Sequence, residues 1–285
     1  MDINYTQIWQ SLLFLVVCLA LFFIGKLIFQ LFNKKINVNI ELTDKDNLSF
    51  FFIYIGYFFG ILAAIGGIMS SPETAEFKYE LLYVLIYGLV SIIVLNLVAK
   101  VLDYFFISDE YCRTEVVDKF TNSIGIYKAG QFVSIGIVLA GVLLTEIEKP
   151  LELIVFLGAS VVLLTLGSFY YTLITPFEDV KEIKNGNSAV AISYVGAQIS
   201  IAILIFAVFQ TMFLSWEESI KWAALDLGIG LVLLPIVRII IDNIFLPNHK
   251  LTNELVNQEK PNVGAGMLEA FAYIGTSILV IWCIY

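Results

Sequence analysis

Eight long stretches with very few charged residues constrain this chain more than any other feature. A helix needs about 20 consecutive, largely apolar residues to cross the hydrocarbon core of a bilayer. Each of the eight stretches has that length. We expect spans at Trp9–Phe32, Ser49–Met69, Leu81–Phe106, Ser123–Leu144, Leu151–Ile174, Ser188–Phe213, Trp222–Phe245 and Val263–Tyr285. The predicted fold class is an all-α polytopic membrane protein with eight transmembrane helices.

The composition supports lipid as the solvent. Of 285 residues, 59% are hydrophobic and 14% are charged, with a mean hydropathy of +0.89. Soluble domains are roughly half apolar and a quarter charged. The net charge of −9 argues against a nucleic-acid partner. The start of the chain carries Asp2 and no basic residue before Lys26. We therefore expect the first apolar stretch to remain as a span rather than to be a cleaved signal.

An internal repeat divides the chain into two. An asparagine opens an apolar run at each of Asn47, Asn122, Asn187 and Asn262. The first two asparagines are 75 positions apart, as are the last two, and Asn47 lies 140 positions before Asn187. A fixed period indicates duplication. We expect a first four-helix repeat over residues 1–148 and a second over residues 149–285. Because four is an even number, the two repeats should insert in parallel.

The lysines and arginines predict the orientation. Loops after the odd-numbered spans carry nine basic residues against three in the other loops. Cytoplasmic loops are enriched in basic residues, so both termini are expected outside. All four tryptophans then fall at the outer interface.

The four asparagines allow two interpretations. Each stands where an outward-running helix is expected to begin, and asparagine is a favoured N-cap. The alternative is that four positive helix ends converge on an anionic group.

Small residues recur at fourfold spacing in the even-numbered spans. Gly56, Gly60 and Ala64 are one example, and Ala189, Ser193 and Ala197 are another. Such spacing lets helix backbones approach closely in lipid. We therefore expect the even-numbered spans to form an inner layer and the bulkier odd-numbered spans an outer one.

Ionisable residues within the spans are the main functional candidates, because they are costly in a bilayer. Lys128 and Glu269 lie at nearly equivalent repeat positions and are expected to pair across the axis that relates the halves. The pair can be a structural lock or part of ion handling. Snorkelling of both groups to the cytoplasmic surface is a further alternative.

Three further acids complete the candidate set. Asp103 and Asp242 follow Lys100 and Arg238 by three and four positions, and this spacing predicts salt bridges within each helix. Asp226 lies in the same predicted helix as Pro235, and together they are a candidate hinge.

Catalytic and metal-binding patterns are absent from the sequence. His249 is the only histidine, and Cys18, Cys112 and Cys283 are scattered without metal-ligand spacing. We therefore expect neither an enzyme, nor a cofactor, nor a metal site.

Three segments resemble a known family. They are ITPFEDVKEIKNGNSAVAISYVG (Ile174–Gly196), VRIIID (Val237–Asp242) and NQEKPNVGAGMLEAFAYIG (Asn257–Gly275). They are similar to the YjfL-like bacterial inner-membrane family, domain of unknown function 350. The pattern is an asparagine followed by small residues and a glycine, matched by Asn187, Ala189, Ala191, Gly196, Asn262, Ala265 and Gly266. The resemblance implies single or duplicated four-helix units, a location in the bacterial inner membrane and a link to envelope-stress proteins. In that membrane, the orientation expected from the basic residues places both termini in the periplasm.

Two functions follow as expectations. The first is a permeation or transport unit for a small ion, lined or gated by Lys128, Glu269 and Asp226. The second is a membrane scaffold that recruits a cytoplasmic stress protein and transports nothing. A homo-oligomer is compatible with both.

Overall fold

The structure is a computed structural model that describes residues 5–71, 76–144, 150–209, 216–246 and 249–284. The described part contains eight helices that are long and apolar enough to cross a membrane. They are α1 (Tyr5–Phe32), α2 (Leu48–Ser70), α3 (Phe77–Phe105), α5 (Asn122–Leu144), α6 (Pro150–Ile174), α8 (Ser188–Val208), α9 (Trp216–Ile240) and α11 (Val263–Ile284). The predicted all-α, eight-span fold class is confirmed. Helix α3 begins four residues before the predicted start at Leu81, and part of the predicted end of α8 lies outside the described residues.

Short helical segments precede the four inner spans on one side of the molecule. They are η1 (Ile40–Asp44), α4 (Asp109–Val117), α7 (Asp179–Lys184) and α10 (Leu251–Val256), with η2 (Ile241–Phe245) continuing α9. Because α2, α5, α8 and α11 all begin at this side, we call it the capped side.

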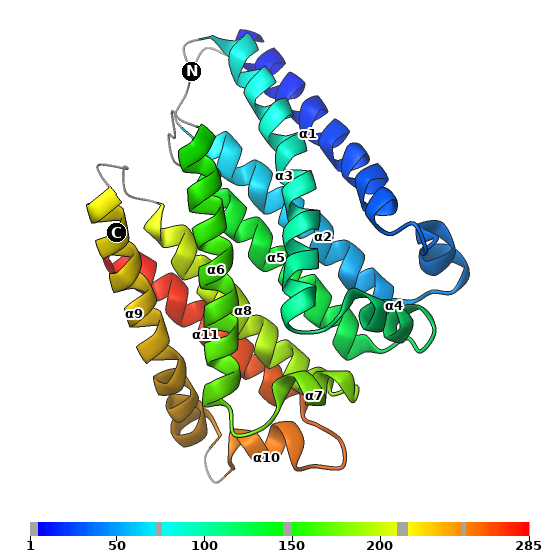
Figure 1. Ribbon diagram of the computed structural model, residues 1–285, viewed down its shortest axis with the longest axis vertical. Helices are drawn as coiled ribbons and strands as arrows, with labels where there is room; N and C mark the ends of the chain where they lie inside the picture. The colour runs from blue at the N-terminus through cyan, green and yellow to red at the C-terminus, as the bar shows by residue number, and fades with distance from the viewer. Residues whose placement is uncertain (1–4, 72–75, 145–149, 210–215, 247–248, 285) are drawn as a thin grey trace.

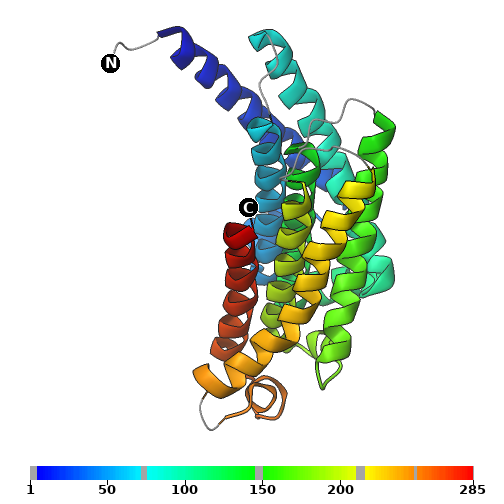
Figure 2. The same cartoon turned by 90° about the vertical axis from the view of Figure 1, so that its left-hand side faces the viewer.

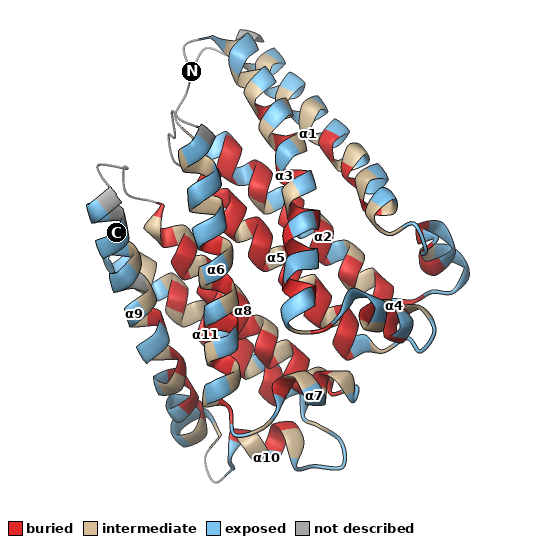
Figure 3. Cartoon of the chain, viewed as in Figure 1, coloured by how far each residue is buried: buried red, intermediate tan, exposed pale blue. Residues whose placement is uncertain are grey.

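The second, fourth, sixth and eighth spans are α2, α5, α8 and α11. These four helices lie in a row, in that order (Figure 1). The other four spans, which are α1, α3, α6 and α9, pack along one face of this row, as the turned view shows (Figure 2). The row is the inner layer expected from the small residues. Burial decreases toward its end, and α11 exposes much of its surface (Figure 3). The second repeat follows the first along the row, so that α5 contacts α8 rather than α11.

Glycines set the spacing within each half. A Cβ atom added to Gly56 of α2 would lie 2.4 Å from Cα of Ala129 in α5. A Cβ added to Gly196 of α8 would lie 2.2 Å from Cα of Ala270 in α11. These equivalent contacts align α2 with α8 at an offset of 140 residues and α5 with α11 at an offset of 141. The one-residue difference makes Lys128 equivalent to Glu269.

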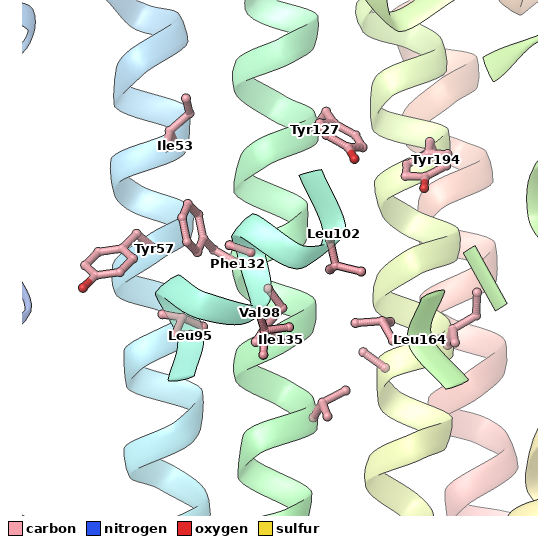
Figure 4. Packing of buried hydrophobic residues seen from close by; sticks show 14 of the residues in the cluster. Ile53, Tyr57, Leu95, Val98, Leu102, Tyr127, Phe132, Ile135, Leu164 and Tyr194 are labelled. Carbon is pink, nitrogen blue, oxygen red and sulfur yellow. The ribbon is translucent and has the colours of Figure 1, made fainter. Parts of the chain in front are cut away.

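Apolar side chains from the outer helices fill the spaces that the row leaves open. In the first half, Leu95 and Val98 of α3 pack beside Tyr57 of α2 and beside Phe132 and Ile135 of α5 (Figure 4). The core of each half is thus built from an inner pair of helices and the outer helices that cover it.

We predict that a larger side chain at the glycine contacts disrupts each half. Gly196→Leu and Gly266→Leu should each lower the free energy of unfolding by at least about 1–3 kcal/mol, because a backbone atom occupies the added volume. The measurement is the unfolding midpoint of the purified protein in detergent. Gly158→Leu in α6 is the matched control, since nothing lies within 4 Å of its added Cβ. Equal effects at the three positions would contradict the close packing of the row.

Candidate functional site

Three of the four asparagines have the geometry of N-caps. The side chains of Asn47 and Asn187 accept hydrogen bonds of 3.1 Å from the backbone N–H groups of Phe50 and Val190. The side chain of Asn262 accepts one of 3.2 Å from Ala265. Each cap therefore satisfies one of the backbone donors that a helix start leaves free.

Asn122 does not have this role. It is the first residue of α5 and is exposed, while the carbonyl of Thr121 accepts the first backbone hydrogen bonds of the helix. The reason is the one-residue shift between the halves, which makes Thr121 the equivalent of Asn262.

A glutamate in each short segment supports the cap that follows it. The carboxylate of Glu41 accepts from Asn47, that of Glu182 from Asn187 and that of Glu254 from Asn262, at 2.7, 3.2 and 2.9 Å. Glu115 accepts from the Thr121 hydroxyl at 2.9 Å. These glutamates were not singled out from the sequence, although each precedes its cap by five to eight residues. Their negative charge at every inner helix start opposes the binding of a further anion there.

Glu115 is held in its charged form. Burial alone would raise its pKa, but hydrogen bonds from Lys119 and Thr121 outweigh that effect and lower the pKa. The cap therefore keeps a charged acceptor near neutral pH.

Among the described residues, each half contains one buried ion pair between an inner and an outer helix. In the first half, Nζ of Lys128 in α5 lies 2.6 Å from both carboxylate oxygens of Asp103 in α3. In the second half, Nη1 of Arg238 in α9 lies 2.8 Å from Oε1 of Glu269 in α11. All four side chains are buried. The inner helix thus carries the cation in one half and the acid in the other.

The predicted pairing of Lys128 with Glu269 is wrong. Helix α8 lies between α5 and α11 in the row, so each charged group finds its partner on the outer helix of its own half.

The predicted salt bridges within helices are also wrong. The ammonium group of Lys100 lies over the ring of Phe32 at 5.2 Å, and Asp103 pairs with Lys128 instead. Asp242 accepts a 2.6 Å hydrogen bond from the backbone N–H of Leu251, at the start of α10. The side chain of Asp226 lies outside what the structure describes.

Glu269 is the centre of a hydrogen-bond network that is buried from solvent. It accepts hydrogen bonds from Ser193 and, at 2.9 Å, from the hydroxyl of Tyr273. The Ser193 hydroxyl is also 2.7 Å from that of Tyr171. Arg238 makes a second contact of 3.3 Å with Thr252. A buried charge with this many partners is stabilised in place.

A cavity adjoins the ion pair of the first half. It has a volume of about 40 Å³ and is lined by Lys128 and Asp103 together with Asn33, Lys100 and Arg113. A water molecule needs about 10–15 Å³ of such space. The cavity can therefore hold water beside the ion pair.

A set of buried polar groups follows the contact between the halves. We call this contact, formed by α5 and α8, the seam. The rings of Tyr127 and Tyr194 face each other across it at 5.6 Å (Figure 4). Gln131 and Gln198 follow one turn further along the two helices, and both are fully buried.

Four oxygen atoms in this region have no hydrogen-bond partner among the described residues. They are Oε1 of Gln131, Oγ of Ser134, Oη of Tyr194 and Oε1 of Gln198. A buried polar atom without a partner is costly, and it commonly marks a bound water or ion. These residues are not among those predicted from the sequence, because glutamine, serine and tyrosine carry no charge that would mark them within a span.

Asp179 is a titratable group outside the spans, in α7. It accepts a hydrogen bond from the Thr175 hydroxyl through one oxygen, and its Oδ1 has no partner among the described residues. Burial raises the pKa of Asp179 from an ordinary 3.8 to about 7, although the hydrogen bond from Thr175 acts in the opposite direction. Glu269 also raises this pKa, and Arg238 lowers it.

Comparison with known proteins gives one family. The family model for the domain of unknown function DUF350 matches residues 2–143 and again residues 144–284. No curated protein and no solved structure matches the chain significantly. Within the described residues, no group of three or more His, Cys, Asp or Glu side chains is placed to hold a metal ion.

We predict that the two ion pairs are energetically separate. Lys128→Met should lower the free energy of unfolding by about 3–5 kcal/mol, because it leaves Asp103 buried and unpaired. Adding Asp103→Leu should restore most of the loss. Adding Glu269→Leu instead should lower the stability further, because it leaves Arg238 unpaired. Chemical unfolding in detergent measures all three, and recovery with Glu269→Leu would contradict the observed pairing.

A second prediction concerns pH. The folded state holds a proton on Asp179 up to about pH 7, whereas the unfolded chain loses it near pH 4. The stability that this proton confers is present below pH 4, and it is lost as the pH rises to about 7 and above. The loss is at most roughly 4 kcal/mol. Asp179→Asn should remove this dependence in thermal unfolding followed between pH 4 and 8. Glu178→Gln, at the exposed neighbour, should retain it.

Proposed function

This chain belongs to the DUF350 family as two tandem copies of its domain, and on that premise we propose that it conducts a small cation across the membrane along the seam. The proposal rests on the four oxygen atoms without hydrogen-bond partners. Two belong to Gln131 and Ser134 of α5, and two belong to Tyr194 and Gln198 of α8. Oxygen atoms of amides and hydroxyls are ligands for water, for protons in a water chain and for alkali cations.

The depth of these groups supports a path. Gln131 lies nine residues after the start of α5, and Gln198 lies ten residues after the start of α8. At 1.5 Å per residue, both are about 14–15 Å from the capped side. The hydrocarbon core is about 30 Å thick, so both glutamines lie near its middle. Polar atoms at this depth favour a path over purely structural packing.

The Lys128–Asp103 pair supplies an entrance on the capped side. The water-sized cavity meets this pair, and Gln131 lies one turn further into the membrane on the same helix. Asp103 balances the charge of Lys128 at 2.6 Å, so the ammonium group does not repel a cation while the pair is intact. In this proposal the pair acts as a gate, because separating the two groups would leave the ammonium charge uncompensated at the entrance. The capped side is cytoplasmic in this proposal, in a bacterial inner membrane, as the basic loops favour.

Flux in liposomes tests the proposal. Purified protein is reconstituted, and a pH-sensitive dye or an alkali-cation dye inside the vesicles reports entry. The double variant Gln131→Leu with Gln198→Leu should reduce flux at least tenfold. Its free energy of unfolding should stay within about 1 kcal/mol of the wild-type value, because removal of two unpartnered oxygens offsets the loss of the hydrogen bonds that the amide nitrogens donate to Tyr127 and Ser168. A loss of flux without a loss of stability separates conduction from folding.

The control is Ser91→Ala in α3, a buried serine whose hydroxyl already donates to the carbonyl of Tyr87. This variant should conduct like the wild type. Wild-type flux no greater than that of empty vesicles, or full flux in the double glutamine variant, would refute the proposal.

A membrane scaffold is the second candidate. A hollow of about 620 Å³ on the capped side favours it, because Tyr111, Glu178, Lys181, Lys184 and Asn185 surround it with polar groups that a cytoplasmic protein could contact. Replacing Gln131 and Gln198 by leucine should leave a scaffold fully active. The same double variant therefore distinguishes the two functions.

A further inference from the structure

Asp179 is a buried acid that the packing of the fold does not require. It lies three residues before Glu182, the glutamate that supports the Asn187 cap. In the first half, Val38 lies three residues before Glu41, which has the same role. Asp179 is 1% exposed and Val38 is 2% exposed. Because a valine fills this place in one half, the acid in the other half needs a separate explanation.

The carboxyl group of Asp179 has an oxygen that is not used. Its Oδ2 accepts a hydrogen bond from the hydroxyl of Thr175, and its Oδ1 has no partner among the described residues. When the group is protonated it is neutral and carries one O–H donor. When it is charged, its burial is costly unless a cation or further donors face it. Loss of the proton therefore leaves a buried charge that needs a cation nearby.

Arg238 is the cation that faces this region. Its guanidinium group lies 5.5 Å from the ring centre of Phe177, and Phe177 precedes Asp179 by two residues. Nη1 of Arg238 binds Glu269, and Nη2 contacts Thr252 at 3.3 Å. These contacts use two of the five N–H donors of a guanidinium group. Donors therefore remain for a second carboxylate on the side of Phe177.

The other groups around Asp179 cannot neutralise it. Tyr171 of α6 and Tyr194 of α8 interact with Asp179 through phenol groups, which carry no positive charge. Glu269 has the same sign as Asp179 and raises its pKa, whereas Arg238 lowers it. Two further acids, Glu178 and Glu182, flank Asp179 in sequence. The other cations on α5 and α7 have partners of their own, which are Glu178 for Lys181, the ring of Tyr111 for Lys184 and Asp103 for Lys128.

From this arrangement we infer that Asp179 and Glu269 share Arg238, and that loss of the proton from Asp179 draws the guanidinium group away from Glu269 and toward α7. While Asp179 is protonated, Glu269 is the one carboxylate that binds Arg238. Once Asp179 is charged, Arg238 stands between two carboxylates. The switch links the proton concentration on the capped side to α11, the inner helix that carries Glu269.

The proton has a route to water, and the transition falls near neutral pH. Asp179 forms part of the wall of the hollow of about 620 Å³ on the capped side, so the proton of its O–H group can pass to water there. Burial raises the pKa of Asp179 to about 7. Arg238 is therefore bound to Glu269 alone below about pH 7 and is shared above it. Cation conduction along the seam is not part of this switch, so either proposal can fail without the other.

The side-chain nitrogens of arginine report the switch directly. The chain has two arginines, Arg113 and Arg238. NMR of the isotope-labelled arginine side chains in lipid nanodiscs therefore gives two sets of signals, and Arg113→Lys assigns them. The signals of Arg238 should shift with a midpoint of about pH 7. In Asp179→Asn, which stays neutral, this shift should be absent.

The control is His249→Gln. His249 lies 3.5 Å from Glu254 in α10, and a histidine commonly changes its charge in this pH range. The control should keep the shift of Arg238. Arg238 signals that do not move in the wild type, or that move as far in Asp179→Asn, overturn the inference.

Glu269→Gln tests whether the two acids share the arginine. Without the competing carboxylate, Arg238 should pair with Asp179 and lower its midpoint by about one pH unit or more. The midpoint is followed by the infrared band of the protonated carboxyl group that is missing in Asp179→Asn. Lys128→Met with Asp103→Leu removes the ion pair of the first half and should leave the midpoint unchanged. An equal midpoint in Glu269→Gln and the wild type means that Arg238 is not shared, and the comparison with Asp179→Asn does not depend on the folding of this variant.

Discussion

The close approach of helix backbones at glycine holds this structure together. In a bilayer the lipid tails are as apolar as leucine, so burial of apolar side chains gives helices little reason to associate. Contact between backbones supplies the attraction, because dispersion forces act over many atom pairs at short range. Gly56 against Ala129 and Gly196 against Ala270 make this contact in the two halves. The position of every inner helix, and so of every buried polar group, depends on it.

The buried ion pairs depend on that framework and not on the symmetry of the repeat. Each pair joins an inner helix to the outer helix of its own half. A pair of this kind needs one cation and one acid within reach, and it does not matter which helix carries which. The first half can therefore use Lys128 on the inner helix while the second half uses Glu269 at the same position. Each half thus holds a neutral pair, with opposite charges at the equivalent inner positions and with outer partners, Asp103 and Arg238, that are not equivalent in the repeat.

The sequence alone predicts the spans, the duplication and the inner row, because apolar length, a fixed period and small residues report these directly. It does not predict which charged groups pair. The pairing depends on the order of the helices in the row, and the repeat alone does not show whether α8 or α11 lies beside α5. The fourth cap is Thr121 rather than the predicted Asn122, because the offset between the halves is 140 residues for α2 and α8 but 141 for α5 and α11. Nor does it predict the seam glutamines as functional residues, because a neutral amide within a span is compatible with helix packing as well as with a path.

The order of the row also explains how one contact can acquire a function. A four-helix unit on its own can form the contact of α5 with α8 only with a second molecule, and both molecules then carry the same residues. Fusion of two units places this contact inside one chain and leaves its repeat equivalents free at the two ends. The internal contact carries Gln131 and Gln198, whose repeat equivalents are Ala272 and Phe58. Duplication thereby allows a polar seam within the chain while the equivalent positions elsewhere stay apolar.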